Sequence, residues 1–175
     1  LDFFVGKYGS NSVVIVKCGI GKVNAAACTQ VLIDHFAVDC VINVGVAGGI
    51  FADLKIGDVV ISTDAVQHDM DVSALGDPIG TIPRMDESYF KADEELIELA
   101  EKAGETLEGH NVYKGRVASG DKFTSTQEQK TFLWNNFKAY CAEMEGAAMA
   151  HVCYLNRIPF VIIRSISDNA DGSAG

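Results

Sequence analysis

Positive charge is scarce in this sequence. Lys and Arg number 14 against 24 Asp and Glu, which gives a net charge of −10. Nucleic acids and anionic membrane surfaces both bind through cationic side chains, so we expect neither as a partner. No apolar run reaches the roughly 18 residues of a membrane-spanning helix. The opening LDFFVGKYGS also lacks the basic start and apolar core of a signal peptide.

Paired cysteines are missing as well. The five cysteines, at positions 18, 28, 40, 141 and 153, are odd in number and never form a CxxC motif. Several lie in apolar stretches typical of a core, so we interpret them as reduced structural thiols rather than disulfides. Reduced thiols are typical of the cytoplasm, where we expect the protein to act.

Repeats, low-complexity tracts and linkers are absent, so no feature divides the chain. Its 175 residues, 48% of them apolar, have the size and composition of one globular domain. We therefore expect a single domain over 1–175.

The sequence does contain a regular alternation of Val/Ile-rich runs and helix-like segments. Apolar strands separated by helices indicate a sheet covered on both faces, so the sequence predicts an α/β fold of three layers. The expected strands are 12–18, 40–46, 57–66, 111–119, 139–142 and 159–167, and the expected helices are 19–38 after a glycine turn, 91–107, 126–134 and 146–156.

Glycine and polar clusters follow the ends of these strands. In α/β sheets, ligands bind beyond the carboxyl ends of the strands. The sequence therefore predicts a binding site where these clusters meet. They are 19–21, 47–49, 120–123, 143–145 and 167–168.

Two motifs resemble other kinds of site only weakly. GIGK (19–22) lacks the Ser or Thr after Lys22 and the earlier glycine of a phosphate-binding loop, so a tight turn is the better interpretation. HDMD (68–71) offers His68, Asp69 and Asp71, but no further His or Cys ligand lies nearby. A polar loop is favoured there, and we expect no metal.

The charged residues near the strand ends each allow two interpretations. Glu143 and Glu145 share one face of a strand and offer acceptors to vicinal sugar hydroxyls, or they form a charged helix start. Phe123 either stacks on a flat base or belongs to the core. Asp168 is a functional acid or a turn cap, and Arg164 pairs with one of the glutamates or serves the site.

Taken together, these motifs resemble the nucleoside phosphorylase/nucleosidase family, and within it the bacterial 5′-methylthioadenosine/S-adenosylhomocysteine nucleosidases. The matching blocks run in order along nearly the whole chain. They are GIGKVNAA (19–26), NVGVAGGI (43–50), IGDVVIS (56–62), HDMDVSALG (68–76), SGDKF (119–123), AEMEGAAMAHVC (142–153) and PFVIIRSISDNAD (159–171).

The resemblance implies a three-layer α/β/α sandwich with a mixed central sheet, working as a homodimer without cofactor or metal. It also implies hydrolysis of the N-ribosidic bond of 5′-methylthioadenosine and S-adenosylhomocysteine, in methionine and S-adenosylmethionine salvage. The products are adenine and the 5′-thio-ribose. The reaction passes through an oxocarbenium-like sugar, as glycoside hydrolysis does, and needs a protonated leaving group.

The resemblance also assigns catalytic roles near the end of the chain. Asp168 matches the general acid that protonates N7 of the purine, and Ser167 matches the residue that orients this acid. Arg164 matches a residue that orders the polar network near the attacking water.

The remaining pocket positions contact the base and the sugar in the family. Glu145 matches the acceptor of the ribose hydroxyls, Met144 packs against the sugar, and Glu143 lines the same pocket. Phe123 matches the residue that stacks on adenine, while the backbone at Thr124 meets the edge of the base.

Further positions surround the nucleoside from below and at its 5′ end. Ala47 and Gly48 let the backbone approach the nucleoside closely, and Ile20 lies near the apolar 5′ substituent. Three positions reach into the pocket of the neighbouring subunit and cover that substituent there: Val72, Leu75 and Pro83.

The sequence departs from the family pattern in two ways. The family holds its hydrolytic water with a glutamate upstream of the first strand, and it has a covering helix at the C-terminus; the 175 residues contain neither segment. Val46 stands where many relatives carry a serine near the water. Since Val46 donates no hydrogen bond, we expect a different water network.

Other functions remain open at this stage. Phosphorylases of the same fold carry an arginine for phosphate where this chain has the uncharged Asn43, so water is favoured as the nucleophile. A hydrolase of another adenine nucleoside, aminodeoxyfutalosine, is an alternative. A non-catalytic nucleoside-binding module is another, although it has no need for Asp168.

Overall fold

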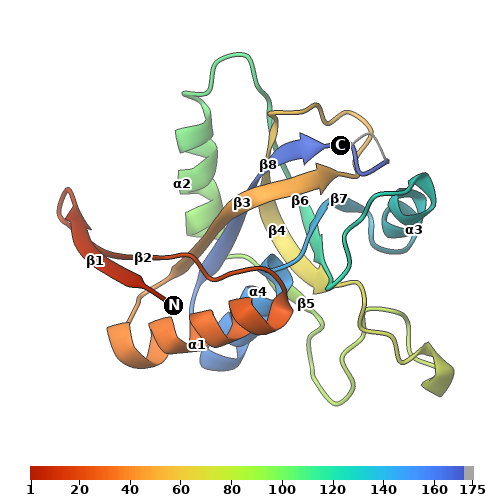
Figure 1. Cartoon of the computed structure of the whole chain (residues 1–175), viewed down its shortest axis with the longest axis horizontal. Helices are drawn as coiled ribbons and strands as arrows, with labels where there is room; N and C mark the ends of the chain where they lie inside the picture. The colour runs from red at the N-terminus through yellow and green to blue at the C-terminus, as the bar shows by residue number, and fades with distance from the viewer. Residues whose placement is uncertain (172–175) are drawn as a thin grey trace.

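A mixed sheet of six strands forms the centre of the computed structural model, which describes residues 1–171 (Figure 1). Its strands are β3 (Val41–Gly49), β4 (Val59–Gln67), β5 (Tyr89–Lys91), β6 (Val112–Ser119), β7 (Ala139–Glu143) and β8 (Phe160–Asp168). Their order is β5-β4-β6-β7-β3-β8. The β3–β8, β4–β6 and β6–β7 pairs are parallel, whereas β3–β7, β4–β5 and β4–β8 are antiparallel. Because β4 also pairs with β8, the last strand in this order, the sheet curls until β8 meets β4.

Helices cover the sheet on both sides. Figure 1 shows α1 and α4 below the sheet and α2 above it, with α3 beside β7. This arrangement confirms the predicted α/β fold with a mixed central sheet. None of the helices in residues 1–171 is long and apolar enough to cross a membrane. Their bounds are α1 (Lys22–Phe36), α2 (Glu94–Gly104), α3 (Gln127–Phe137) and α4 (Gly146–Asn156), with a short 3₁₀ helix, η1 (Ser73–Leu75).

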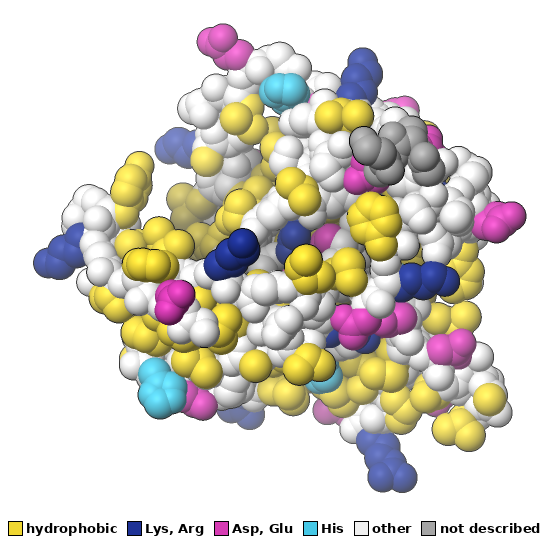
Figure 2. Space-filling view, in the orientation of Figure 1, with side chains coloured by type: hydrophobic (Ala, Val, Ile, Leu, Met, Phe, Trp, Pro, Cys, Tyr) yellow, Lys and Arg dark blue, Asp and Glu magenta, His cyan; other side chains and the backbone are white. Residues whose placement is uncertain are grey.

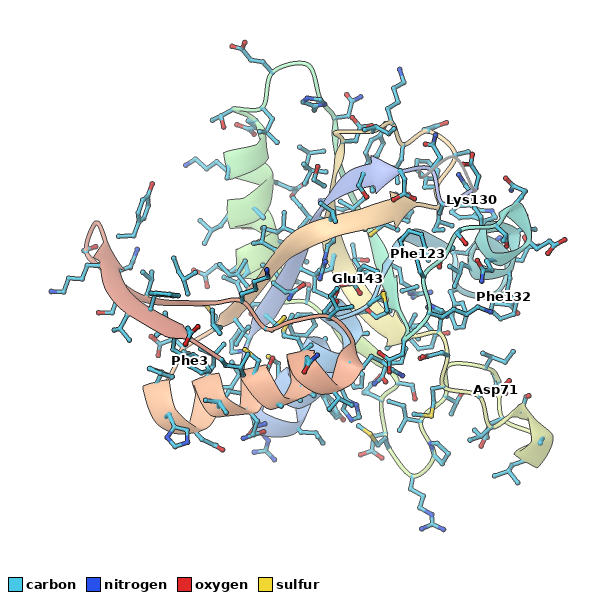
Figure 3. All side chains as sticks on the ribbon, in the orientation of Figure 1. Phe3, Asp71, Phe123, Lys130, Phe132 and Glu143 are labelled. Carbon is cyan, nitrogen blue, oxygen red and sulfur yellow. The ribbon has the colours of Figure 1, made fainter. Side chains whose placement is uncertain are left out.

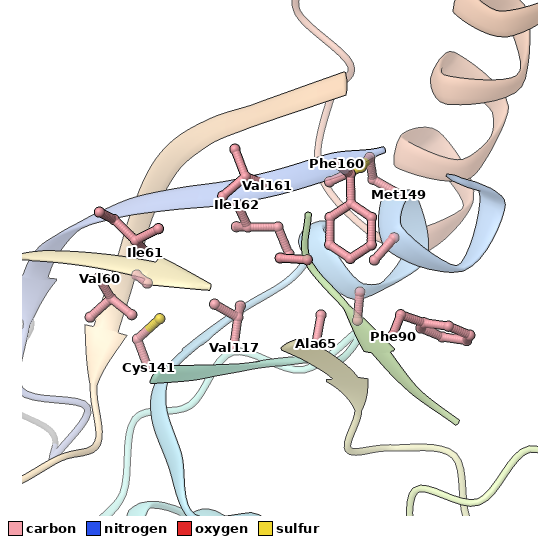
Figure 4. Packing of buried hydrophobic residues seen from close by; sticks show 14 of the residues in the cluster. Val60, Ile61, Ala65, Phe90, Val117, Cys141, Met149, Phe160, Val161 and Ile162 are labelled. Carbon is pink, nitrogen blue, oxygen red and sulfur yellow. The ribbon is translucent and has the colours of Figure 1, made fainter. Parts of the chain in front are cut away.

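The core fills the space between α4 and the sheet (Figure 4). Side chains of β4, β6 and β8 point into it and are almost completely buried. Burying a Val, Ile or Phe side chain contributes about 1.5–3 kcal/mol, so this layer holds the strand ends in fixed positions. The labelled members in Figure 4 include Val60, Ile61, Val117, Met149 and Ile162.

The first predicted strand does not join the central sheet. It forms β2 (Asn11–Val16), which within residues 1–171 pairs only with β1 (Phe3–Tyr8), a strand that was not predicted. The two form an antiparallel hairpin with Tyr8 opposite Asn11, and Gly9, at φ +60°, supplies the turn. The hairpin is anchored by Phe3, which stacks on Phe36 of α1 with ring centroids 5.1 Å apart.

Hydrophobic side chains are exposed on the face that carries the hairpin (Figure 2). Alternate residues of β3 take part because one face of this strand has no helix over it in the described residues. The exposed residues of the hairpin and β3 are Phe4, Val5, Ile15, Ile42, Val44 and Val46.

Several helix boundaries differ from the expectation by a few residues: α1 runs from Lys22 to Phe36, α2 ends at Gly104 and α3 continues to Phe137. Strand pairing explains two further differences. β3 continues to Gly49 rather than ending at position 46, because its last residues pair with β7. The helix expected at 91–107 begins at Glu94, since Tyr89–Lys91 forms the edge strand β5 on β4. Asp93 caps this helix by accepting a hydrogen bond from the Leu96 N–H.

Candidate functional site

A cavity of about 260 Å³ lies at the carboxyl ends of β3, β7 and β8. We call it the site cavity. Every residue predicted for the pocket of a single chain lines it, and two lining residues, Lys122 and Ala142, were not predicted. The predicted lining residues are Ile20, Val46, Ala47, Gly48, Phe123, Thr124, Glu143, Met144, Glu145, Arg164, Ser167 and Asp168.

A β-bulge places Asp168 in the cavity. β3 and β8 run in parallel register up to Ala47 and Ile166, after which Gly48 pairs with Asp168, so Ser167 is an extra residue. Bulges redirect side chains and are frequent beside active sites. Gly48 is required here because a Cβ atom would lie 2.9 Å from the Cβ of Ala170 and 3.1 Å from Oδ1 of Asp168.

The carboxylate of Asp168 is buried and held at both oxygens. Its Oδ2 accepts a hydrogen bond of 2.8 Å from the Ser167 hydroxyl, and its Oδ1 accepts one of 2.9 Å from the N–H of Ala170. The sequence offered a turn cap and a functional acid as alternatives. The structure shows the turn cap, and the same carboxylate lines the cavity, where the role of a functional acid stays a prediction.

Glu143 and Arg164 form a buried ion pair beneath the cavity. The carboxylate of Glu143 also accepts a hydrogen bond from the Ser119 hydroxyl. Its two oxygens share the N–H of Gly146, at 3.0 Å for Oε1 and 2.8 Å for Oε2. Burial raises the pKa of Glu143, while Arg164 and Ser119 act in the opposite direction. Since unpaired buried charges cost several kcal/mol, each partner needs the other to remain charged.

Arg164 has further partners on β3. Its Nη2 donates to the side-chain oxygen of Asn43, and its Nη1 donates to the carbonyl of Val46 at 3.1 Å. Its Nε is buried and has no hydrogen-bond partner among residues 1–171. Gly45 makes room for the guanidinium, because a Cβ atom there would lie 2.4 Å from Nη1. The expected ion pair with a glutamate is therefore observed, next to the cavity.

Glu145 connects the cavity to the start of α1. Although it is the N-cap residue of α4, its side chain makes no capping bond to that helix. Its Oε1 accepts a hydrogen bond of 3.0 Å from the Gly21 N–H, and its Oε2 lies 3.7 Å from Nη1 of Arg164. Of the two glutamates, Glu143 therefore stabilises the start of α4, by bonding the N–H of Gly146. Glu145 does not, and it lines the cavity.

Apolar side chains form the opposite wall. The side chains of Ile20, Val46 and Phe123 are exposed to solvent, while Thr124 is buried. Figure 3 shows Phe123 close to Glu143, and both line the same cavity. The cavity therefore combines an aromatic side chain, which can stack on a flat ring, with acceptor oxygens.

The three residues predicted to reach a neighbouring subunit lie outside the site cavity. Val72 and Leu75 lie at η1, and Pro83 lies further along the segment between β4 and β5, which protrudes from the sheet in Figure 1. Leu75 and Pro83 are exposed and Val72 is half-buried. They are therefore located on the surface of this chain.

The HDMD segment forms a hydrogen-bonded loop. Asp69 pairs with Lys22 at 2.6 Å, and Asp71 accepts a hydrogen bond from the N–H of Ser73. Within residues 1–171, no group of His, Cys, Asp and Glu side chains is arranged to hold a metal ion.

A larger depression of about 800 Å³ lies at the amino end of β8. We call it the amino-end depression. The start of α2, the end of α4, the edge strand β5 and the start of β8 surround it, whereas ligands in α/β sheets bind beyond the carboxyl ends of the parallel strands. Its walls include Phe90, Glu94, Tyr154, Arg157 and Phe160.

The match to a family model covers the whole chain. Residues 1–175 match the model described as the phosphorylase superfamily, and the chain belongs to this family. A curated relative from Actinobacillus succinogenes, named 5′-methylthioadenosine/S-adenosylhomocysteine nucleosidase, is 46% identical over 173 residues, covering 98% of this chain and 74% of the relative. A relative of the same name from Geobacillus is 44% identical over 170 residues, covering 97% of this chain and 73% of the relative.

Solved structures agree with this membership. A mutant nucleosidase of Helicobacter pylori with 5′-methylthioadenosine in its active site superposes with a TM-score of 0.93 at 39% identity, covering 99% of this chain and 74% of that one. A nucleosidase of Colwellia psychrerythraea in complex with adenine gives 0.93 at 41% identity, covering 98% and 72%. The futalosine hydrolase of Helicobacter pylori gives 0.92 at 39% identity, covering 98% and 73%.

Proposed function

We propose that this protein hydrolyses the N-ribosidic bond of 5′-methylthioadenosine and S-adenosylhomocysteine, releasing adenine and the 5′-thio-ribose. One observation carries the proposal: the site cavity brings Asp168, Glu145 and Phe123 together at the carboxyl ends of the strands. The names of the relatives support the same substrates. The activity belongs to methionine and S-adenosylmethionine salvage. The unpaired cysteines support a place in the cytoplasm.

Asp168 acts as the general acid in this proposal. An adenine anion is a poor leaving group, so protonation of N7 must accompany cleavage of the bond to ribose. The 2.8 Å hydrogen bond from Ser167 to Oδ2 fixes the carboxyl group in one orientation. A positioned acid of this kind contributes about 10²–10⁴-fold in rate.

Glu145 binds the ribose hydroxyls, and Phe123 stacks on the base. The carboxylate accepts hydrogen bonds from both hydroxyls, which strengthen as the sugar becomes cationic. Met144 packs against the sugar beside it, and Ile20 lies at the 5′ end. Gly48 and Ala47 allow the backbone to approach the nucleoside from below.

Water is the nucleophile in the proposed reaction. A phosphorylase needs a cation that is available to phosphate. The guanidinium of Arg164 is instead paired with Glu143, lies 3.7 Å from Glu145, and is bonded to the uncharged Asn43. Arg164 therefore orders the polar network around the water rather than binding an anion.

A homodimer completes the proposed active site. The exposed Leu75 and Pro83, with the half-buried Val72, lie on a protruding segment that is suited to reach a second subunit. Their apolar side chains would cover the 5′ substituent of the nucleoside bound there. We also propose that the chain forms a single domain. It spans 73–74% of the length of the curated relatives named above.

Aminodeoxyfutalosine is the second candidate substrate. The futalosine hydrolase of Helicobacter pylori matches the fold as well as the nucleosidases do, at a TM-score of 0.92. The two substrate classes share adenosine and differ at the 5′ position. The cavity residues that contact base and ribose therefore serve either substrate.

Product analysis tests the proposal. The purified protein is incubated with 5′-methylthioadenosine, S-adenosylhomocysteine or aminodeoxyfutalosine in phosphate-free buffer containing a chelator, and adenine is measured by chromatography. We expect adenine from the first two substrates at the highest kcat/KM. Strict dependence on phosphate, with ribose-1-phosphate as product, would contradict hydrolysis. Binding without any product would indicate a nucleoside-binding module.

A further inference from the structure

Helix α1 has no side-chain cap of its own. Its N-cap residue is Gly21, at φ +96°, and its first turn contains no acidic residue. The first N–H groups of a helix need acceptors, which a neighbouring Ser, Asp or Asn commonly provides. Here the acceptors come from distant parts of the chain: Oε1 of Glu145 for Gly21, at 3.0 Å, and Oδ1 of Asp121 for Lys22, at 2.8 Å.

The position of Lys22 conflicts with local helix electrostatics. The N-terminus of a helix carries partial positive charge, which disfavours a cation in the first turn. Lys22 is nevertheless the first residue of α1. Its Nζ lies 2.6 Å from Oδ1 of Asp69, and both side chains are largely shielded, with 18% and 27% of their surface exposed. Departures from local rules are concentrated at functional sites.

Asp69 joins three segments through one carboxylate. Its Oδ1 binds Lys22 at the start of α1, and its Oδ2 accepts a hydrogen bond of 2.8 Å from the N–H of Asp121 in the loop after β6. Asp121 in turn holds the N–H of Lys22. Burial raises the pKa of Asp69, but the hydrogen bonds from Lys22 and Asp121 lower it overall, which keeps the carboxylate ionised.

We propose that Lys22 and Asp69 are positioning residues that hold the Gly21 N–H against Glu145 and thereby orient its carboxylate for ribose. The inference rests on the proposed function and concerns how this site is kept in order. With Oε1 held by Gly21, Oε2 remains for the sugar hydroxyls. Without the ion pair, the glycine turn at 19–21 loses its side-chain attachment to the loop after β4 and, of its bonds to the loops after β4 and β6, keeps only the backbone bond of Lys22 to Asp121.

Paired ligands test the inference. One is the carbon-linked analogue of 5′-methylthioadenosine, whose base is joined to ribose by a bond that is not hydrolysed, and the other is free adenine. In Lys22→Met, we expect the dissociation constant of the analogue, measured by calorimetry, to rise roughly 10- to 100-fold. Adenine, which has no ribose, should bind within about twofold of wild type, because its contacts do not involve Glu145.

Two control variants separate positioning from general destabilisation. Lys22→Arg keeps the cation and should restore tight analogue binding. Lys114→Met removes the exposed Lys114–Glu101 pair, 3.0 Å long, which is remote from the cavity, and should bind both ligands as wild type does. Equal weakening of analogue and adenine in Lys22→Met, or wild-type binding of both, would overturn the inference.

Amide hydrogen exchange gives a readout that needs no ligand. In Lys22→Met and Asp69→Asn, we expect faster exchange of the Gly21 N–H, with exchange in the core strands unchanged. Unchanged protection of Gly21 would overturn the inference even if the wild-type protein hydrolyses the substrates. The two proposals can also fail separately. If the wild-type protein has no nucleosidase activity but the variants lose protection of the Gly21 N–H, the proposed function is overturned and the positioning role remains.

Discussion

The site cavity and the amino-end depression lie at opposite ends of β8 and differ in the origin of their charges. In the depression, Asp93 caps α2, and Glu94 and Glu95 occupy its first turn, where the helix dipole favours acids. Helix stability therefore explains every one of these three carboxylates. The depression is also the larger of the two, at about 800 Å³ against about 260 Å³.

Local capping explains the charges of the site cavity only in part, because Glu143 bonds the N–H of Gly146 and Asp168 bonds that of Ala170, whereas Arg164 has no capping role. Glu143 and Arg164 are buried together under it, and Asp168 is buried at its wall. Burying charges is costly, and well-packed apolar residues would often be as stable. A buried ion pair beside a cavity, which capping alone does not require, therefore identifies a site better than the volume of the cavity does.

The largest effect should come from Asp168→Asn. The amide keeps the size of the side chain and an acceptor for the N–H of Ala170, but it has no proton to give to a leaving purine. We expect kcat to fall at least about 100-fold, measured by adenine release. Binding of the carbon-linked analogue should change much less. A near-normal kcat would show that another residue is the acid, while a lower melting temperature with normal kcat would leave only the turn cap.

An intermediate effect is expected for Glu145→Gln. The amide oxygen can still accept the hydrogen bond from Gly21, so the start of α1 should remain in place. Loss of the charge weakens the bonds from the ribose hydroxyls by about 2–4 kcal/mol in the transition state, read from kcat/KM. Unchanged kinetics combined with a large drop in melting temperature would contradict a role in ribose binding.

The smallest effect is expected at the amino-end depression. Arg157 ends α4 in the left-handed conformation, at φ +56°, which favours glycine. Arg157→Gly should therefore raise the free energy of unfolding by about 0.5–1 kcal/mol, measured by urea denaturation. Nucleosidase activity should stay the same. Loss of activity without loss of stability would give the depression a functional role and undo the comparison.

The sequence predicted the composition of the cavity better than it predicted the sheet. Strand ends are marked by composition, so Gly48, Glu143 and Asp168 could be assigned to a common edge before their contacts were known. Strand partners are not marked in this way. Alternating apolar residues predicted a strand at 12–18 but gave no information that it would pair with β1 instead of the central sheet.

The ion pair between Lys22 and Asp69 could not be predicted from the sequence for a related reason. Each residue was considered within its own motif, GIGK or HDMD, and each motif was interpreted as an ordinary loop. Contacts between loops follow no periodicity, and these two residues are 47 positions apart. The conflict between a lysine and the start of a helix was the available signal.

The capping of α1 by remote acceptors also has a consequence for the order of folding. Glu145 lies 124 positions after Gly21, and Asp121 lies 99 positions after Lys22. Contacts of such separation form only after a large loss of chain entropy, so the first turn of α1 is completed late although it lies early in the chain. At synthesis rates of about 5–20 residues per second, this turn waits on the order of 10 s for its acceptors. The ribose-binding corner is then assembled among the last parts of the domain.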